Sequence, residues 1–239
     1  NQYYTSYNLT EINTTSTTAL QAALVNKDIL LIPENEISSP TAFTAFASVL
    51  QSFVANGGSV IFCGSGGSYA QSIFNTGLFS GTYGGYTSST LSNVNPSHFI
   101  ATGIPSTFAY QNASYYYNIT NVDAVNVIQY SSFSLVAFRE IGSGKAILVG
   151  YDYYANTSTE AARLIANSVE WAASGSLPNW LRINNLSGNV STGSSDTLYV
   201  TLDASSLASG THTANITINT NDPLNATVVI PVTFNVSFN

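Results

Sequence analysis

The first part of the chain alternates short apolar runs with longer segments of helical spacing. The apolar runs 28–33, 59–63, 124–130, 135–141 and 145–151 predict strands, and 3–9 is a further, more polar strand candidate. Apolar residues recur at helical spacing in 17–25, 41–56 and 159–173, which predicts three helices. Helices interleaved with short strands are typical of a three-layer α/β fold with a mostly parallel, flavodoxin-like sheet, here over residues 1–174.

Glycine marks the turns of this first domain. Gly57-Gly58 ends the second predicted helix, and Gly142-Ser143-Gly144 predicts a hairpin between two strands. Residues 77–117 are rich in Gly, Ser, Asn and Tyr, which favours long surface loops where a ligand could bind.

The pattern changes to a period of two after Gly175-Ser176-Leu177-Pro178. Apolar residues alternate with polar ones in 198–202, 213–219 and 230–238, with a turn at Asn221-Asp222-Pro223. This predicts an all-β, Ig-like sandwich over residues 178–239.

The chain carries very little charge. Charged residues make up 7% of its 239 residues, and the net charge is −7. Solubility then has to come from attached glycans, or the uncharged surface is buried against other subunits. The five basic residues are scattered, which excludes nucleic acid as a partner, and no apolar run approaches the roughly 20 residues that span a bilayer. Asn1 suggests a processed terminus, so we expect an extracellular or cell-surface protein.

Acceptor sequences for N-linked glycans occur along the whole chain. They are Asn8, Asn13, Asn112, Asn118, Asn156, Asn185, Asn189, Asn215, Asn225 and Asn235. Strand alternation turns Asn215 and Asn235 away from the apolar face, so both are accessible acceptors.

Several motifs of the first domain occur in the order of a known superfamily. They are Asp28-Ile-Leu-Leu-Ile-Pro33, Phe53-Val-Ala-Asn-Gly-Gly-Ser-Val-Ile61, Ser97-His-Phe-Ile-Ala-Thr-Gly-Ile-Pro105, Val136-Ala-Phe-Arg-Glu-Ile-Gly-Ser-Gly-Lys145 and Val149-Gly-Tyr-Asp-Tyr-Tyr154. With them the domain resembles the non-catalytic, trehalose-utilisation-like branch of the glutamine amidotransferase-like superfamily. The resemblance implies that members of the catalytic branch have a Cys on a sharp turn after the strand equivalent to 59–63. A His–Glu pair after a later strand activates this Cys.

The second domain resembles the bacterial Ig-like modules that are appended to secreted proteins. The likeness rests on Trp180-Leu181, Leu186-Ser-Gly-Asn-Val190, Val200-Thr-Leu-Asp-Ala-Ser205, Gly210-Thr-His-Thr213 and Asn219-Thr-Asn-Asp-Pro223. Such modules have two further strands before the Trp-Leu pair, and here the preceding helix leaves no room for them. A neighbouring copy could fill the gap by donating a strand, with residues 3–9 as the donor. A reduced module or a fragment is the alternative explanation.

Catalytic residues are sparse. Cys63 ends the buried 59–63 strand and is expected to be a core thiol, and Ser65 lies between glycines in a loose echo of a nucleophile elbow. A nucleophile needs a base within hydrogen-bond reach, and neither His98 nor His212 follows the last strand, where the resemblance would require it. We therefore expect no catalytic residue and no enzyme, with a cryptic hydrolase as the remote alternative.

Two further kinds of site are considered. Glu34, Glu36, Asp152 and Asp222 are candidate Ca²⁺ ligands, although helix caps and solvated loop acids explain them more simply. Tyr115, Tyr116 and Tyr117 are candidates for stacking on sugars or on a second subunit. No other cofactor is expected.

The sequence favours a non-enzymatic, glycosylated, extracellular structural protein. We expect copies of it to self-associate into a homopolymer, as a filament, sheath or surface layer, through sheet edges and Tyr-rich faces. The alternative is a carbohydrate-binding or adhesion module of a larger secreted protein.

Overall fold

The computed structural model describes residues 9–35, 39–109, 114–151, 158–173, 180–183, 188–204, 207, 209–222 and 224–237. The chain divides into two compact units, Asn1–Ser176 and Leu177–Asn239. The predicted strand 3–9 lies outside the described residues except for Leu9, which belongs to no helix or strand. In the described part of the chain, no helix is long and apolar enough to cross a membrane.

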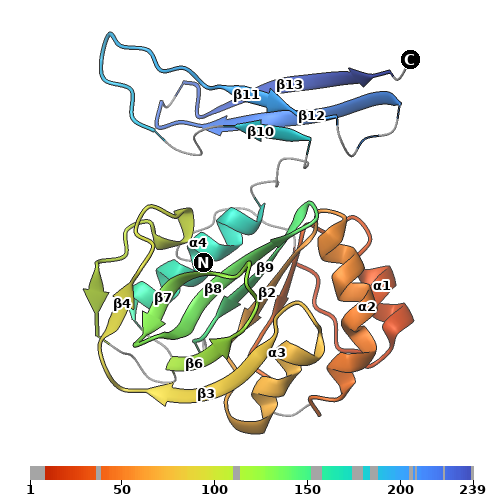
Figure 1. The fold of residues 1–239 in the computed structure, drawn as a ribbon, viewed down its shortest axis with the longest axis vertical. Helices are drawn as coiled ribbons and strands as arrows, with labels where there is room; N and C mark the ends of the chain where they lie inside the picture. The colour runs from red at the N-terminus through yellow and green to blue at the C-terminus, as the bar shows by residue number, and fades with distance from the viewer. Residues whose placement is uncertain are drawn as a thin grey trace. The chain divides into compact units, whose positions relative to one another are not determined.

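The helices and strands predicted for residues 17–63 and 124–173 are present, and further strands lie between these two stretches (Figure 1). In chain order they are α1 Thr17–Ala23, β1 Ile29–Ile32, α2 Ala42–Ala55, β2 Ser59–Cys63, η1 Gly67–Ala70, α3 Gln71–Asn75, β3 Gly81–Thr87, β4 Leu91–Asn93, η2 Phe99–Ala101, β5 Thr107–Phe108, β6 Ser114–Ile119, β7 Val125–Tyr130, β8 Phe133–Ile141, β9 Gly144–Val149 and α4 Thr159–Ala173.

The sheet is mixed, so the prediction of a mostly parallel sheet is wrong. Among the residues that the structure describes, it has nine strands, in the order β1-β2-β9-β8-β7-β4-β5, with β6 joining β8 to β3. Only β1–β2 and β2–β9 pair in parallel among the described strands, and the remaining pairs are antiparallel. Tight turns cause this, because Gly142 (φ 62°) and Ser131 (φ 54°) adopt the left-handed conformation that reverses the chain into β9 and β8.

The parallel strands form the middle of three layers, between α2 on one face and α4 on the other. The side chains of Val60 and Phe62 on β2 join the core beneath α2, which contributes Leu50. Ile61 points to the opposite face and joins the core under α4, with Leu164. Because β2 is buried on both faces, it is apolar along nearly its whole length, as a central parallel strand must be. The α/β class is confirmed.

Residues 77–117 were predicted to be long surface loops, and that prediction is wrong. They contain β3, β4, β5 and most of β6. β3 contains only Gly, Thr and Tyr and therefore shows no familiar apolar alternation, although Tyr is a good strand former. The sheet positions Tyr83, Tyr86, Tyr115, Tyr116 and Tyr117.

The described residues of the second unit form two antiparallel ribbons. They are β10 Leu181–Ile183 with β11 Val200–Leu202, and β12 Gly210–Asn219 with β13 Thr227–Val236. Trp180, Leu181 and Ile216 form a small buried core between them. The predicted alternation of β12 and β13 is confirmed, because Ile216 and Val236 are buried while Asn215 and Asn235 are exposed. A complete Ig-like sandwich stays a prediction.

Candidate functional site

The loop after β2 occupies the position that a catalytic elbow would take. Cys63 ends β2 and is 2% exposed, and Gly64-Ser65-Gly66 follows it. β1 and β9 lie on either side of β2 and run parallel to it, so residues after all three strands meet at one carboxyl edge. Glu34 and Asn35 follow β1, and Gly150 and Tyr151 follow β9.

Ser65 is buried, and hydrogen bonds fix both its side chain and its backbone. Its side chain and backbone are 2% exposed, and its Oγ accepts a hydrogen bond from the Asn35 N–H (2.8 Å). The Tyr117 hydroxyl donates to the Ser65 carbonyl (2.9 Å) and accepts from the Ser65 N–H (2.9 Å). One phenol therefore satisfies both backbone groups of the residue that an elbow would present to a substrate.

Tyr115 covers the glycines on either side of Ser65. A Cβ built on Gly64 or on Gly66 would lie 2.8 Å from the Tyr115 ring, closer than real side chains approach. The Tyr115 hydroxyl donates to Glu34 Oε1 (2.9 Å), which fixes the ring over the loop. Tyr83 packs edge-on against this ring, with centroids 6.3 Å apart. The small residues around Ser65 thus make room for tyrosine.

Tyr116 points to the opposite face of the same strand. Its ring lies against Gly84 and Gly85, where a Cβ would come within 2.6 Å and 2.7 Å of the Tyr116 side chain. Tyr130 and Phe133 flank it, at centroid distances of 5.0 Å and 5.1 Å. Cross-strand packing of this kind replaces the missing side chains of the β3 glycines.

These contacts bear on the predicted binding role of Tyr115, Tyr116 and Tyr117. Tyr117 is 0% exposed, so it cannot stack on a sugar or on a second subunit. Strand alternation sends Tyr115 and Tyr116 to different faces of β6. The three residues do not form one binding surface, and carbohydrate binding at Tyr115 or Tyr116 stays a prediction.

The phenols at this edge are poor bases. Burial raises the pKa of Tyr117 well above its usual value of 10.0, and burial also raises the pKa of Tyr83. Tyr151, where the resemblance would require a histidine, is 1% exposed, and burial raises its pKa. Its hydroxyl has no hydrogen-bond partner among the described residues. At neutral pH these phenols stay protonated and cannot accept a proton from Ser65 or Cys63.

His98 lies at the other end of the sheet. It precedes η2, where its Nδ1 accepts the Ile100 N–H (3.2 Å). Its ring stacks on Phe138, with centroids 4.2 Å apart, and meets Trp171 edge-on, with centroids 4.9 Å apart. Burial, with the charge of Lys145, lowers the pKa of His98 to about 4. Lys145 is near the start of β9, whereas the Ser65 loop adjoins the end of β9. At about 3.3 Å per residue, the two ends of this strand are roughly 15 Å apart. His212 is in the second unit, beside Trp180.

Lys145 is a buried cation that the sequence analysis did not single out. It is 3% exposed, its Nζ donates to the Trp171 carbonyl (2.5 Å), and it lies 4.6 Å from the Trp171 ring centre. Ser59 Oγ donates to the next carbonyl, that of Ala172 (3.2 Å). The two side chains satisfy the last turn of α4, where a positive charge is favourable. In the sequence, this buried cation was indicated by a single Lys in the otherwise apolar run 145–149.

The calcium candidates do not converge in the described part of the chain. Glu34 accepts the Tyr115 hydroxyl, and Asp222 accepts the Leu224 N–H (2.9 Å) and the Asn225 side-chain amide (3.0 Å) in a turn. These hydrogen bonds lower the pKa of Asp222. Glu36 and Asp152 lie outside the described residues. No group of three or more His, Cys, Asp or Glu side chains among the described residues could hold a metal ion.

Every predicted glycan acceptor that the structure describes is exposed. These are Asn13, Asn118, Asn189, Asn215, Asn225 and Asn235, while Asn8, Asn112, Asn156 and Asn185 lie outside the described residues. Exposure is necessary for glycosylation and does not by itself establish it, so occupancy stays a prediction.

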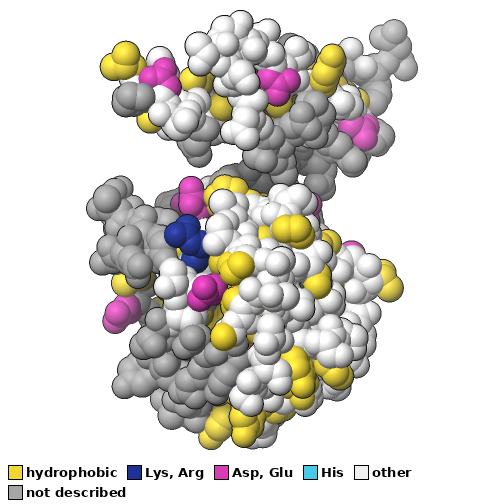
Figure 2. Space-filling model, turned by 90° about the vertical axis from the view of Figure 1, so that its left-hand side faces the viewer, with side chains coloured by type: hydrophobic (Ala, Val, Ile, Leu, Met, Phe, Trp, Pro, Cys, Tyr) yellow, Lys and Arg dark blue, Asp and Glu magenta, His cyan; other side chains and the backbone are white. Residues whose placement is uncertain are grey.

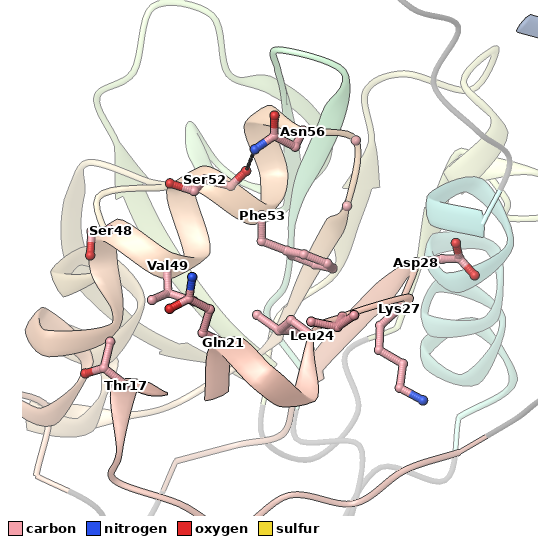
Figure 3. A pocket seen from close by; sticks show the side chains of 13 residues that line it. Thr17, Gln21, Leu24, Lys27, Asp28, Ser48, Val49, Ser52, Phe53 and Asn56 are labelled. Carbon is pink, nitrogen blue, oxygen red and sulfur yellow. Dashed lines mark hydrogen bonds between the residues drawn. The ribbon is translucent and has the colours of Figure 1, made fainter. Parts of the chain in front are cut away.

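A groove of about 660 Å³ lies between α1 and α2. Its apolar lining comes from Leu24, Val25, Val49 and Phe53, and its polar lining includes Gln21, Lys27 and Asn56 (Figure 3). Asn56 donates to the Ser52 carbonyl (2.8 Å), and Lys27 to Thr10 Oγ1 (3.0 Å). None of the predicted site residues lines it.

Comparison with known proteins supports the α/β fold. No family model and no curated protein matches the chain. Two solved cytoplasmic proteins, from Salmonella typhimurium and from Salmonella typhimurium LT2, are similar at a TM-score of 0.50, with 15% and 12% identity. Each match covers 67% of this chain and 76% of the other chain. A ThuA-like protein from Bacteroides uniformis has the same coverage, with 13% identity and a TM-score of 0.49. At such low identity the likeness extends to the fold alone.

Proposed function

We propose that this chain is a non-enzymatic structural protein of the cell exterior, glycosylated and assembled from many copies by strand complementation. The proposal that the chain is non-enzymatic rests on one observation. Tyrosine side chains fill the position at which a catalytic elbow would lie. Tyr115 and Tyr117 occupy the space over Gly64, Ser65 and Gly66 that a substrate would need. The fold is kept, while the position that supports catalysis in the resembled superfamily is packed like a core.

The surface supports an extracellular setting. Few charged side chains appear on the face shown in Figure 2, in keeping with charged residues at 7% of the chain. A protein with so little charge needs another source of solubility, and exposed acceptors such as Asn118, Asn215 and Asn235 could supply it as glycans. The same scarcity of charge lowers the electrostatic cost of packing copies together.

The second unit supports assembly. An Ig-like module short of its opening strands exposes apolar side chains, and Val200, Leu202 and Ile230 are each 40% or more exposed. A strand from a neighbouring copy would cover them. The donor predicted from the sequence, residues 3–9, remains a prediction because residues 3–8 are outside the described part of the chain.

Electron microscopy and analytical ultracentrifugation of the native protein, together with its intact mass, test the proposal. We expect regular polymers and a mass above the 25.3 kDa of the polypeptide by whole glycan units. A protein that stays monodisperse and monomeric at high concentration, with an unmodified mass, would contradict it. A hydrolase activity abolished by S65A or C63A would contradict the non-enzymatic part separately.

A further inference from the structure

The two long strands of the second unit differ in what their free edges can do. β12 and β13 pair through their whole length without a register shift, and Asn215 lies opposite Pro231. Proline has no N–H, so this must be a pair that exchanges no hydrogen bonds, with both backbone nitrogens pointing away from the partner strand. Pro231 therefore blocks the outer edge of β13, as prolines on protected edge strands do.

The outer edge of β12 carries no such block. By the same alternation, Thr213, Asn215 and Thr217 direct their N–H and C=O groups away from β13. In the described part of the chain, β12 pairs with β13 alone. β12 contains no Pro, Asp, Glu, Lys or Arg, the residues that usually protect an edge. One edge of the ribbon is closed and the other is open to pairing.

The two faces of the ribbon differ as well. Asn215 and Asn235, both glycan acceptors, lie on one face and are exposed. The opposite face carries the apolar residues, buried near Ile216 and open beyond it. We call this apolar face of the β12–β13 ribbon the inner face. Its exposed apolar side chains are Ile218 (37%), Val228 (41%) and Ile230 (40%), and those of the β10–β11 ribbon are Val200 (44%) and Leu202 (40%).

We infer that the outer edge of β12, with the open apolar part of the inner face, is the acceptor site for an extended strand of a second copy of this chain. The inference rests on the proposed function and identifies the surface that it uses. A strand added to β12 would pair with Thr213, Asn215 and Thr217, and its alternate side chains would cover Ile218 on the inner face of β12. The glycan face would remain in solvent.

Charge and symmetry identify a second copy as the occupant. Each chain has a net charge of −7, and copies would repel one another at most charged surfaces. β12 and β13 contain no Asp, Glu, Lys or Arg, so a second copy meets no like charge on these strands. The blocked edge of β13 cannot serve as the donor, so the donor strand comes from another part of the second copy. A contact between two different surfaces of identical copies is head-to-tail, and it builds a filament when it does not close into a ring.

The pair Thr213 and Thr233 supplies a matched test. They lie directly opposite each other, are both exposed, and belong to no glycan acceptor sequence. T213P removes an outward N–H from the β12 edge, and T233P removes one from the edge that Pro231 already blocks. Neither substitution removes a hydrogen bond between the two strands.

Sedimentation of the full-length protein provides the readout. We expect wild type and T233P to polymerise alike, and T213P to lose at least nine-tenths of the polymer. T213P polymerising like T233P would overturn the acceptor site and leave the proposed assembly standing. A wild-type protein that stays monomeric would overturn both.

A second pair of variants keeps the test decisive if T213P unfolds, as circular dichroism would reveal. Ile218 of β12 and Val229 of β13 lie on opposite faces of the ribbon, with exposed fractions of 37% and 53%. I218K places a charge on the apolar face, beside the added strand, and is expected to prevent polymerisation. V229K places the same charge on the glycan face and is expected to leave polymerisation unchanged. Equal polymerisation of the two variants would overturn the inference.

Discussion

Removing the Tyr117 hydroxyl should destabilise the loop around Ser65, which lies where a catalytic elbow would be. In Y117F the buried Ser65 N–H and C=O each lose the partner that the Tyr117 phenol provides at 2.9 Å. An unsatisfied buried polar group costs about 1–3 kcal/mol, so two should lower the free energy of unfolding of the first unit by about 2–6 kcal/mol. The ring itself stays, so its packing against Tyr83 and Phe74 is unchanged.

Thermal unfolding followed by calorimetry measures the effect. For a unit of this size, 1 kcal/mol shifts the melting temperature by about 2–4 °C, so Y117F should melt roughly 4–24 °C lower. Y116F is the matched control, because the neighbouring ring packs on Gly84 and Gly85. No hydrogen bond of the Tyr116 hydroxyl is found among the described residues, and we expect Y116F to lie within about 0.5 kcal/mol of wild type. Equal melting temperatures for Y117F, Y116F and wild type would refute the claim that Tyr117 locks Ser65.

Three further predictions follow from the same structure. G66A places a Cβ 2.8 Å from the Tyr115 ring, so it should displace the ring and destabilise the unit by about 1–3 kcal/mol, whereas G66A in a Y115A background should cost less. Burial lowers the pKa of Lys145 to about 8, so the unfolded chain binds the extra proton and stability should rise from pH 8 towards 10.5, by on the order of 3 kcal/mol. Urea unfolding should show this rise in wild type and not in K145M. The lowered pKa of His98, about 4, means that stability should fall as the pH drops from 6.5 towards 4, and H98N should flatten that part of the profile.

The sequence by itself determined the elements whose pattern is local. The spacing of apolar residues placed α4 at 159–173 and β2 at 59–63, with the bounds that the structure has. The Gly142 turn and the alternation of β12 and β13 were also predictable, because turn chemistry and a period of two involve only near neighbours.

Only the tertiary structure decided the mixed sheet and the nature of the candidate site. Strand direction depends on which strands pair, and β3 and β6 are stabilised by Gly–Tyr packing that leaves no apolar alternation to detect. Tyr115 and Tyr117 contact Gly64 and Ser65 across about fifty intervening residues. The sequence suggested an elbow with its histidine missing. The fold shows that position filled, because three-dimensional proximity, which no local pattern encodes, places two tyrosines on it.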